Sequence, residues 1–212
     1  MQFLFLLLLT PLFPVTRPHQ SSLPEIVSPL SDFSEEWNDP KYQGCNTATT
    51  VGYMSDEEKK IIYILNLARA YPKLFCKTVL EQYPEYIDRP ELSGISSFKS
   101  LVNMMNVMKP MKPLQPDHNC YNSAQCHAYN SGLVPYDGHE RTDNCLASKY
   151  YNGECCDYNN DKALDIVMSL IIDEGVESLE HRKTCFTAYK TIGVSIQPHK
   201  TWDTNAVLDF HY

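Results

Sequence analysis

The stretch that decides the fold of this chain runs from Tyr136 to Arg182 and reads YDGHERTDNCLASKYYNGECCDYNNDKALDIVMSLIIDEGVESLEHR. The polar groups that it supplies are His139, Glu154, Asp173 or its neighbour Glu174, and His181. Two neutral imidazoles and two carboxylates can bind a divalent metal, and they can equally serve as a general acid/base set. Groups so far apart in the sequence can act together only if the fold brings them to one place.

Helical signals dominate the chain on both sides of this stretch. Ser55 and Glu58 form a capping box, which predicts a helix with an apolar stripe through Ala68. Apolar spacing and breakers predict further helices over residues 73–82, 96–108 and 117–130, and one that follows Asn160 or Asp161 and stops at Gly175. Asp173 and Glu174 then lie at a helix C-terminus, where a carboxylate costs about 0.3–1 kcal/mol that a metal or cationic partner would offset.

Strand signals gather at the end of the chain. Residues 191–197 and 206–211 are short, rich in β-formers and separated by Pro198 and polar residues, which predicts paired antiparallel strands. A chain that is helix-rich first and strand-rich last is typical of an α+β fold with a small sheet between helical layers.

Composition bounds both the size and the partners of the protein. The 212 residues, 43% of them apolar, predict one domain with appendages and a substantial core. The net charge is −8 with only 18 Lys and Arg, and no basic run is present. Binding to nucleic acid is not expected, because neutralising phosphates requires a clustered basic face.

The N-terminus predicts export. Residues 1–16 contain a nearly continuous apolar run that matches a signal peptide and is too short to span a bilayer, with cleavage expected somewhere between residues 16 and 22. An uncleaved anchor is the alternative. Residues 17–53 are rich in Pro and Ser and predict an extended arm, which Trp37, Tyr42 and Cys45 would pin to the domain. No second segment of spanning length follows, so we expect a secreted, extracellular protein without a transmembrane segment.

Cysteine content agrees with export. The eight cysteines are Cys45, Cys76, Cys120, Cys126, Cys145, Cys155, Cys156 and Cys185. An even number in a secreted chain predicts a disulfide framework of four bridges, whose connectivity does not follow from the sequence. A zinc–cysteine site is the rival interpretation, and it lacks a Cys-x-x-Cys pair.

The order of these segments resembles the CAP superfamily, which comprises cysteine-rich secretory proteins, antigen 5 and pathogenesis-related 1 proteins. Tyr-Asp-Gly-His139 is followed by Asn-Gly-Glu154, by a helix that ends in acids, by Leu-Glu-His181-Arg and by the run from Tyr189 to Ser195. The resemblance covers about Met54 to Phe210, is greatest to the microbial-type SCP domain and implies a CAP/SCP domain over residues 54–212. It implies a disulfide-bonded three-layer α-β-α sandwich with a small antiparallel sheet.

The same resemblance implies the site. CAP domains line a central cleft with two histidines and two acids that hold zinc in several members, and here these are His139, His181, Glu154 and Asp173, with Glu174 as the alternative to Asp173. The alternative to metal binding is a hydrogen-bond network that holds the cleft together. Cys155 and Glu180 replace the family's expected Asn and Gly beside this set.

Function is less sharply predicted. The chain has no serine elbow, phosphate-binding glycine loop or redox Cys-x-x-Cys. We therefore expect a non-enzymatic extracellular binding or effector protein that acts through the CAP cleft or a groove for a lipid, a sterol or a protein partner. The alternatives are a zinc-dependent hydrolase with Glu154 as general base and a structural cell-envelope or matrix protein. His127 is expected to be a packed helix histidine, and His118, His199 and His211 are expected to be surface or structural residues.

Overall fold

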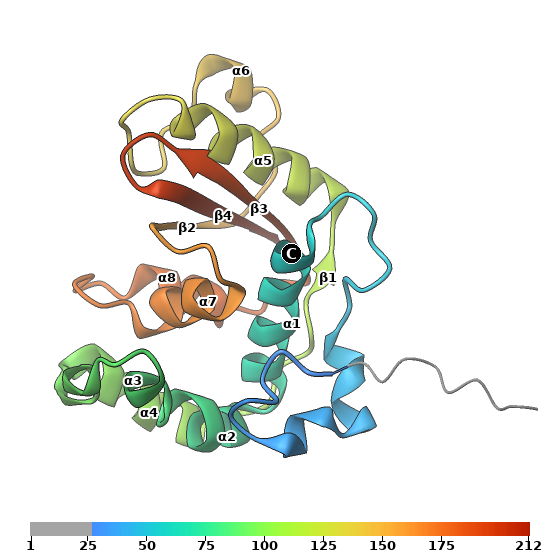
Figure 1. Ribbon diagram of the computed structural model, residues 1–212. Helices are drawn as coiled ribbons and strands as arrows, with labels where there is room; N and C mark the ends of the chain where they lie inside the picture. The colour runs from blue at the N-terminus through green and yellow to red at the C-terminus, as the bar shows by residue number, and fades with distance from the viewer. Residues whose placement is uncertain (1–26) are drawn as a thin grey trace, which may run out of the picture.

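The computed structural model describes residues 27–212, so the predicted signal peptide and its cleavage region lie outside the described residues. The described chain forms an α+β fold with eight α-helices and one four-stranded sheet (Figure 1). The α+β class predicted from the sequence is confirmed.

The sheet is mixed. Its spatial order is β1 (Gln115–Pro116), β3 (Thr191–His199), β4 (Asp203–His211) and β2 (Gly153–Tyr158). β4 pairs antiparallel with both β3 and β2, whereas β1 pairs parallel with β3. The prediction of a purely antiparallel sheet is wrong at this edge, because a two-residue strand is too short to leave an alternating pattern in the sequence.

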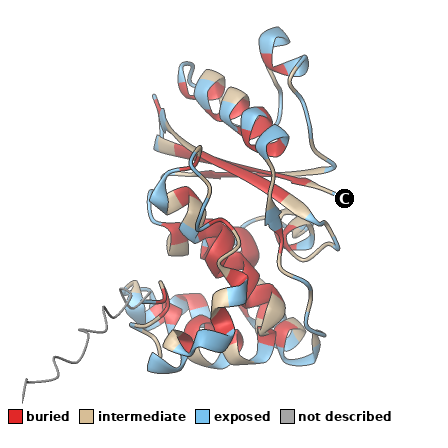
Figure 2. Cartoon of the chain, turned by 90° about the vertical axis from the view of Figure 1, so that its right-hand side faces the viewer, coloured by how far each residue is buried: buried red, intermediate tan, exposed pale blue. Residues whose placement is uncertain are grey.

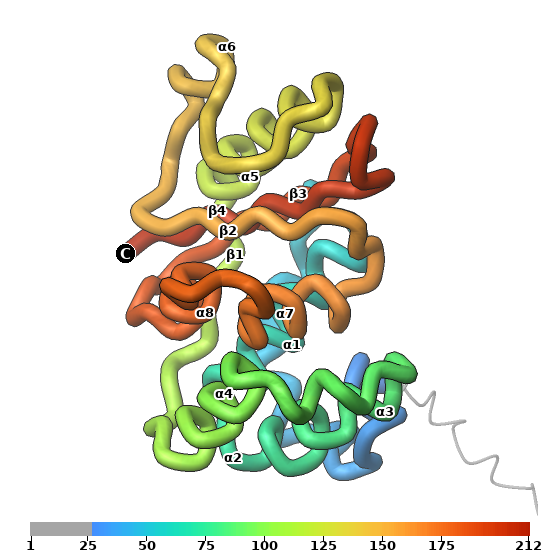
Figure 3. Tube along the Cα trace, turned by 90° about the vertical axis from the view of Figure 1, so that its left-hand side faces the viewer, coloured from blue at the N-terminus to red at the C-terminus, as the bar shows by residue number. Residues whose placement is uncertain are grey.

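Helices lie on both faces of the sheet. α5 (His118–Gly132) covers one face, and α1 (Asp56–Ala70), α7 (Ala163–Ile172) and α8 (Glu180–Cys185) lie on the other (Figures 1 and 3). The shorter elements on the far side of α1 and α7 are α2 (Pro72–Phe75), a π-helical turn (Cys76–Leu80), α3 (Tyr83–Tyr86), a 3-10 turn (Pro90–Gly94) and α4 (Ser96–Val107). α6 (Asp143–Leu146) lies outside α5.

The core is built around α1. Ser55 Oγ accepts the Glu58 backbone N–H at 3.3 Å and Glu58 Oε2 accepts the Ser55 N–H at 2.7 Å, so the predicted capping box is present. The other oxygen of Glu58 accepts the N–H of Ile196 at 2.8 Å, which ties the start of the helix to β3. Figure 2 shows buried positions concentrated along this central helix and on the sheet.

α7 is held at both ends by residues other than those predicted. Neither Asn160 nor Asp161 caps it; the N-cap is Lys162, and the first helical N–H is bound by Glu57 of α1 at 3.0 Å. The helix ends at Ile172 because Asp173 adopts a left-handed conformation with φ of 58°. That turn brings the Asp173 carboxylate back toward α8.

The described part of the predicted arm, residues 27–53, is not extended. Residues 35–45 form two short 3-10 helices, Glu35–Asn38 and Pro40–Cys45. Trp37 is fully buried, donates its indole N–H to Thr78 Oγ1 at 3.0 Å and packs against the Tyr42 ring. The predicted anchoring side chains are therefore buried. The packed core extends upstream of residue 54, because a tryptophan buries a large apolar area against the domain.

The predicted framework of four disulfides is not observed. One bridge joins Cys126 of α5 to Cys145 of α6, with a Cα–Cα distance of 5.5 Å. The other six cysteines are free and buried, at positions 45, 76, 120, 155, 156 and 185. An even count of cysteines shows only that pairing is arithmetically possible, whereas a bridge needs Cα atoms about 4.4–6.8 Å apart and side chains that face one another.

Among residues 27–212, no helix combines the length and the apolar character that a membrane span requires.

Candidate functional site

Two histidine–carboxylate pairs meet at one edge of the molecule. His139, on the loop after α5, lies with Nδ1 2.9 Å from Oε1 of Glu154 on β2. His181, in the first turn of α8, lies with Nδ1 2.8 Å from Oδ1 of Asp173. The structure thus brings together all four residues that the sequence singled out.

The two imidazole rings are neighbours, tilted by 38° to one another. Their centroids are 6.3 Å apart, and the His139 side chain is 54% exposed while that of His181 is 24% exposed. Each ring uses Nδ1 for its carboxylate. Within residues 27–212 the Nε2 atom of neither ring makes a hydrogen bond to protein. A carboxylate on one ring nitrogen fixes the orientation of a histidine and raises the basicity of the other nitrogen.

The ambiguity between Asp173 and Glu174 is resolved by their partners. Asp173 is buried and accepts both the His181 ring and the backbone N–H of Arg182. Glu174 instead forms a two-fold ion pair with Arg89, at 3.1 and 3.2 Å. Asp173 is therefore the acid that orients His181.

A buried arginine fixes the Asp173 side of the site. Arg182 donates to the backbone oxygens of Ile171 and Ile172 at the end of α7, and to Ser97 and Ser100 of α4. These bonds satisfy carbonyl groups that a helix end leaves without partners. They also hold α4, α7 and α8 together next to His181.

The loop that carries His139 is held through Gly138. The His127 ring donates from Nε2 to the Gly138 carbonyl at 2.9 Å, and the Gly138 N–H is bound by the Tyr158 hydroxyl at 2.8 Å. His127 is buried, as the sequence predicted for a packed histidine, and burial lowers its pKa. The hydrogen bond to Gly138 gives His127 a positioning role that the helix pattern alone did not indicate.

Arg141 pairs with Glu154 behind the histidines. Its guanidinium donates to Glu154 Oε2 and, at 2.9 Å, to Asp209 Oδ2 on β4, and all three side chains are at most 3% exposed. Burial by itself would raise the pKa of Glu154, but the hydrogen bond to His139 and the charge of Arg141 outweigh it, so the pKa lies below its usual value. Burial and the neighbouring Glu154 raise the pKa of Asp209.

A second group could offer ligands to a metal. Ligand atoms of His127, Glu154 and Cys156 lie within 4.8 Å of one another. Both oxygens of Glu154 and the Nε2 atom of His127 already have protein partners, and burial raises the pKa of the Cys156 thiol well above its usual value. A cation at this group would have to displace a protein partner of Glu154 or of His127.

The two residues that depart from the CAP pattern, Cys155 and Glu180, point away from the histidine–carboxylate pairs. Cys155 points to the opposite face of β2 from Glu154, with its sulfur 3.6 Å from the His181 carbonyl oxygen. Glu180 is exposed and pairs with Lys183 at 2.9 Å. Neither side chain displaces a member of the His139 and His181 pairs.

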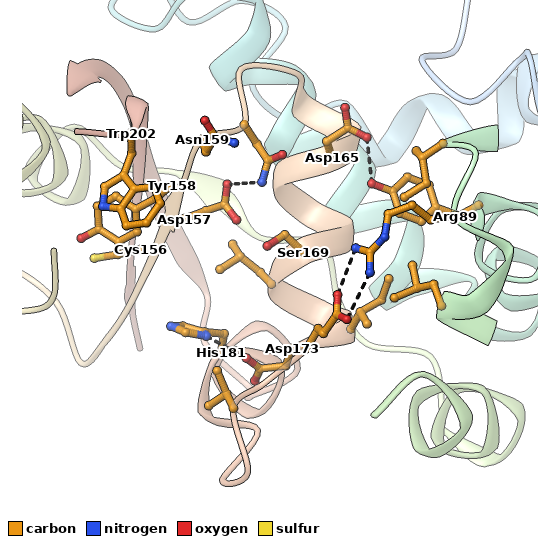
Figure 4. A pocket seen from close by; sticks show the side chains of 18 of the residues that line it. Arg89, Cys156, Asp157, Tyr158, Asn159, Asp165, Ser169, Asp173, His181 and Trp202 are labelled. Carbon is orange, nitrogen blue, oxygen red and sulfur yellow. Dashed lines mark hydrogen bonds and ion pairs between the residues drawn. The ribbon is translucent and has the colours of Figure 1, made fainter. Parts of the chain in front are cut away.

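A groove extends from His181 along α7 and has a volume of about 640 Å³ (Figure 4). Its walls come from β2, α7, the β3–β4 turn and the segment around Arg89. Asp157 lies in it and is only 5% exposed, with its carboxylate 2.8 Å from the Asn160 amide nitrogen. Burial raises the pKa of Asp157 to about 6, which Ser169 and Asn160 only partly oppose.

Sequence reasoning missed Arg141, Asp209 and Asp157. Arg141 lies two residues after His139, and Asp209 interrupts the apolar run of the last strand. An acid at an inward position of a strand needs a partner, so Asp209 could have been flagged and the nearest arginine considered. The sequence offers no comparable signal for Asp157, because its burial depends on how α7 packs against β2.

No protein-family model, no curated protein and no solved structure matches this chain. The resemblance to the CAP superfamily therefore stays an expectation drawn from the sequence.

Proposed function

We propose that this chain is a secreted, non-enzymatic extracellular binding protein of the CAP type, with the helical layers and sheet arranged as a three-layer α-β-α sandwich. It acts through the cleft around His139 and His181, and that cleft binds a divalent ion such as zinc. The supporting observation is the arrangement of two neighbouring imidazoles that are each oriented through Nδ1 by a buried carboxylate.

The donor set suits this role. His139 and His181 would hold the ion through Nε2, while Glu154 and Asp173 would orient the rings rather than bind the metal. A bound zinc ion would act as a Lewis acid with open coordination positions for water or a ligand.

Calorimetric titration of zinc into the metal-stripped protein tests the site. We expect binding that is lost in both His139→Ala and His181→Ala, because two ligands on separate segments are each required. His118→Ala is the matched control, since His118 lies on α5 with its ring against Tyr53, away from the pair. No binding, or binding that survives either cleft substitution, would show that the four residues form a structural network.

Zinc-dependent hydrolysis has less support. A general base works best with a pKa near the working pH, whereas the pKa of Glu154 is lowered and its carboxylate is bound to Arg141 and His139. We expect no chelator-sensitive peptidase or esterase turnover. Turnover that requires zinc and disappears in Glu154→Gln would establish the hydrolase instead.

A separate apolar groove gives the lipid alternative a location. It has a volume of about 550 Å³ and is lined by Arg69, Met111, Lys112, Pro113, Gln115, Ala188, Tyr189 and Lys190. The Arg69 guanidinium is buried, donates only to backbone carbonyls and leaves its Nε without a partner, and burial lowers its pKa to about 10. A positive, apolar groove suits a lipid with an anionic head.

Titration with oleate and with cholesterol separates these lipid classes. We expect oleate to bind and Lys190→Glu to weaken oleate binding. Lys99→Glu, on α4, is the control and should leave oleate binding unchanged. A preference for cholesterol, or equal oleate binding by the two variants, would contradict an anion-selective groove.

A further inference from the structure

The groove along α7 carries charge of one sign. The acids that line it are Asp137, Asp157, Asp165, Asp173 and Glu174, and the lining includes one guanidinium, Arg89. Arg89 is already paired with Glu174, and the imidazole of His181 with Asp173. The remaining acids give the groove a negative potential, which attracts cations and repels anions.

Asp157 differs from the other buried acids of residues 27–212. Glu58 accepts two backbone N–H groups, and Glu154, Asp173 and Asp209 each accept from an arginine or histidine. The hydrogen-bond partners of Asp157 are the neutral Asn160 amide and Ser169 hydroxyl, and the His181 imidazole acts on it only through its charge. A buried carboxylate without a cation or backbone donors is costly for the fold, so a ligand that supplied positive charge would stabilise it.

Tyr158 and Trp202 give the same groove an aromatic surface. Trp202, on the β3–β4 turn, is 40% exposed and lies over Tyr158, with ring centroids 6.5 Å apart (Figure 4). The turn is fixed by His199, whose Nδ1 accepts the N–H groups of Thr201 and Trp202 and whose Nε2 donates to the Tyr136 carbonyl. The indole is therefore held in position before any ligand arrives.

Another part of the wall is aliphatic. Side chains of Ile87, Leu92, Leu170, Ile172 and Val176 line the groove. A small metal ion or a bare ammonium ion would leave this surface in water, whereas an amine with an apolar body would cover it.

We propose that this groove binds an organic ammonium group carried on an apolar body, with the Asp157 carboxylate as its counter-ion and the Trp202 indole against the cation. Charge-assisted hydrogen bonds hold the ammonium, and the face of the tryptophan ring attracts it as well. The site shares His181 with the proposed zinc site but not His139, which does not line the groove.

Calorimetry on the purified protein in the presence of chelator tests the proposal, with phenethylamine and 2-phenylethanol as probes. The two share ring and chain and differ in the ammonium group. We expect phenethylamine to bind at least about tenfold more tightly than the alcohol, since a hydrogen bond to a charged group contributes about 1.5–3 kcal/mol. Because Trp37 is fully buried and the chain has two tryptophans, a change in tryptophan emission on binding reports Trp202.

Substitutions locate the binding. Asp157→Asn should weaken the binding of phenethylamine by about tenfold or more. Trp202→Leu should weaken it by about threefold to tenfold. Asp161→Asn is the matched control, because Asp161 is four residues away and exposed beside Lys162. His139→Ala should leave amine binding intact, so failure of the zinc site and failure of this proposal are distinguishable.

Equal binding of amine and alcohol, undiminished binding by Asp157→Asn, or no binding of phenethylamine would each overturn the proposal. Asp157→Asn is expected to fold at least as stably as the parent, for the reason given in the Discussion, so lost binding cannot be assigned to misfolding. N-acetyl-lysine methylamide serves as a second probe: tighter binding than phenethylamine would support a lysine side chain of a peptide as the source of the ammonium, and weaker binding would support a small amine.

Discussion

At the residue scale, the site is shaped by how each buried charge is compensated. Glu154 and Asp173 each have a histidine and a second donor, which hold the carboxylates in place to orient the rings. The hydrogen-bond partners of Asp157 are neutral, and burial raises its pKa. The first two acids therefore stabilise the fold, whereas the third costs stability at neutral pH.

The cost of Asp157 gives a pH-dependent prediction. Its pKa is about 6 in the folded protein and about 3.9 in the unfolded chain, so the folded state binds the proton more tightly. Ionisation thus destabilises the fold progressively as the pH rises from about 4 to 6. Asp157→Asn should raise the free energy of unfolding by about 1–3 kcal/mol at pH 7.5 and by much less at pH 4.

Urea unfolding at the two pH values measures this difference. Asp161→Asn, at an exposed position, should show no comparable pH dependence. A destabilised Asp157→Asn at pH 7.5 would mean that the carboxylate contributes a stabilising interaction.

Arg141 carries the opposite prediction. Arg141→Ala leaves the buried Glu154 and Asp209 without their shared cation, and breaking a buried ion pair in this way costs about 3–5 kcal/mol. Lys149→Ala is the control, because both cations lie 4.7 Å from the Tyr151 ring but Lys149 has no buried acid as partner. In thermal unfolding, the melting temperature of Arg141→Ala should fall well below that of Lys149→Ala. Equal melting temperatures would show that the ring contact matters more than the ion pairs.

At the scale of elements, the close approach of α5 to β3 decides where the His139 loop emerges. Gly193 makes this approach possible: a Cβ atom there would lie 1.9 Å from the Tyr121 backbone nitrogen. The sequence marks the position only as a glycine in a strand, which is itself a sign of close backbone approach.

Gly193→Ala should therefore push α5 off the sheet. We expect a loss of about 1–3 kcal/mol or more, as for other overpacked sites, together with weaker zinc binding because the loop after α5 carries His139. Gly52→Ala is the control, since a Cβ atom there would meet nothing within 4 Å. Equal unfolding midpoints in urea for the two variants would contradict the close packing.

At the scale of the whole molecule, stability rests on one core rather than on a covalent framework. The packed residues range from Leu30 to Phe210, and one disulfide joins α5 to α6 at the periphery. The six other cysteines are buried among these helices and strands, and burial raises the pKa of several of their thiols, including that of Cys45 to about 11.

Thiol counting checks this arrangement. The folded protein should react slowly with an alkylating reagent, because buried thiols with raised pKa values offer little thiolate. After denaturation without reductant, mass spectrometry should find six alkylated cysteines, and Cys126→Ser should raise the number to seven. Fewer than six alkylated cysteines in the parent protein would show additional bridges. No alkylated cysteine would show the four-bridge framework expected from the sequence.

The sequence by itself determined the α+β class, the capped first helix and the final strand pair, and it singled out His139, Glu154 and His181 with Asp173 or Glu174 as the fourth residue. These depend on local periodicity, on capping and on short motifs, all of which are written in neighbouring residues. Tertiary structure alone decided that Asp173 rather than Glu174 faces His181, that β1 pairs in parallel, that six cysteines stay free, and that Arg141 and Asp209 stand behind Glu154. Each of these depends on which segments distant in the chain lie within a few ångströms of one another, a property that packing sets and local sequence does not.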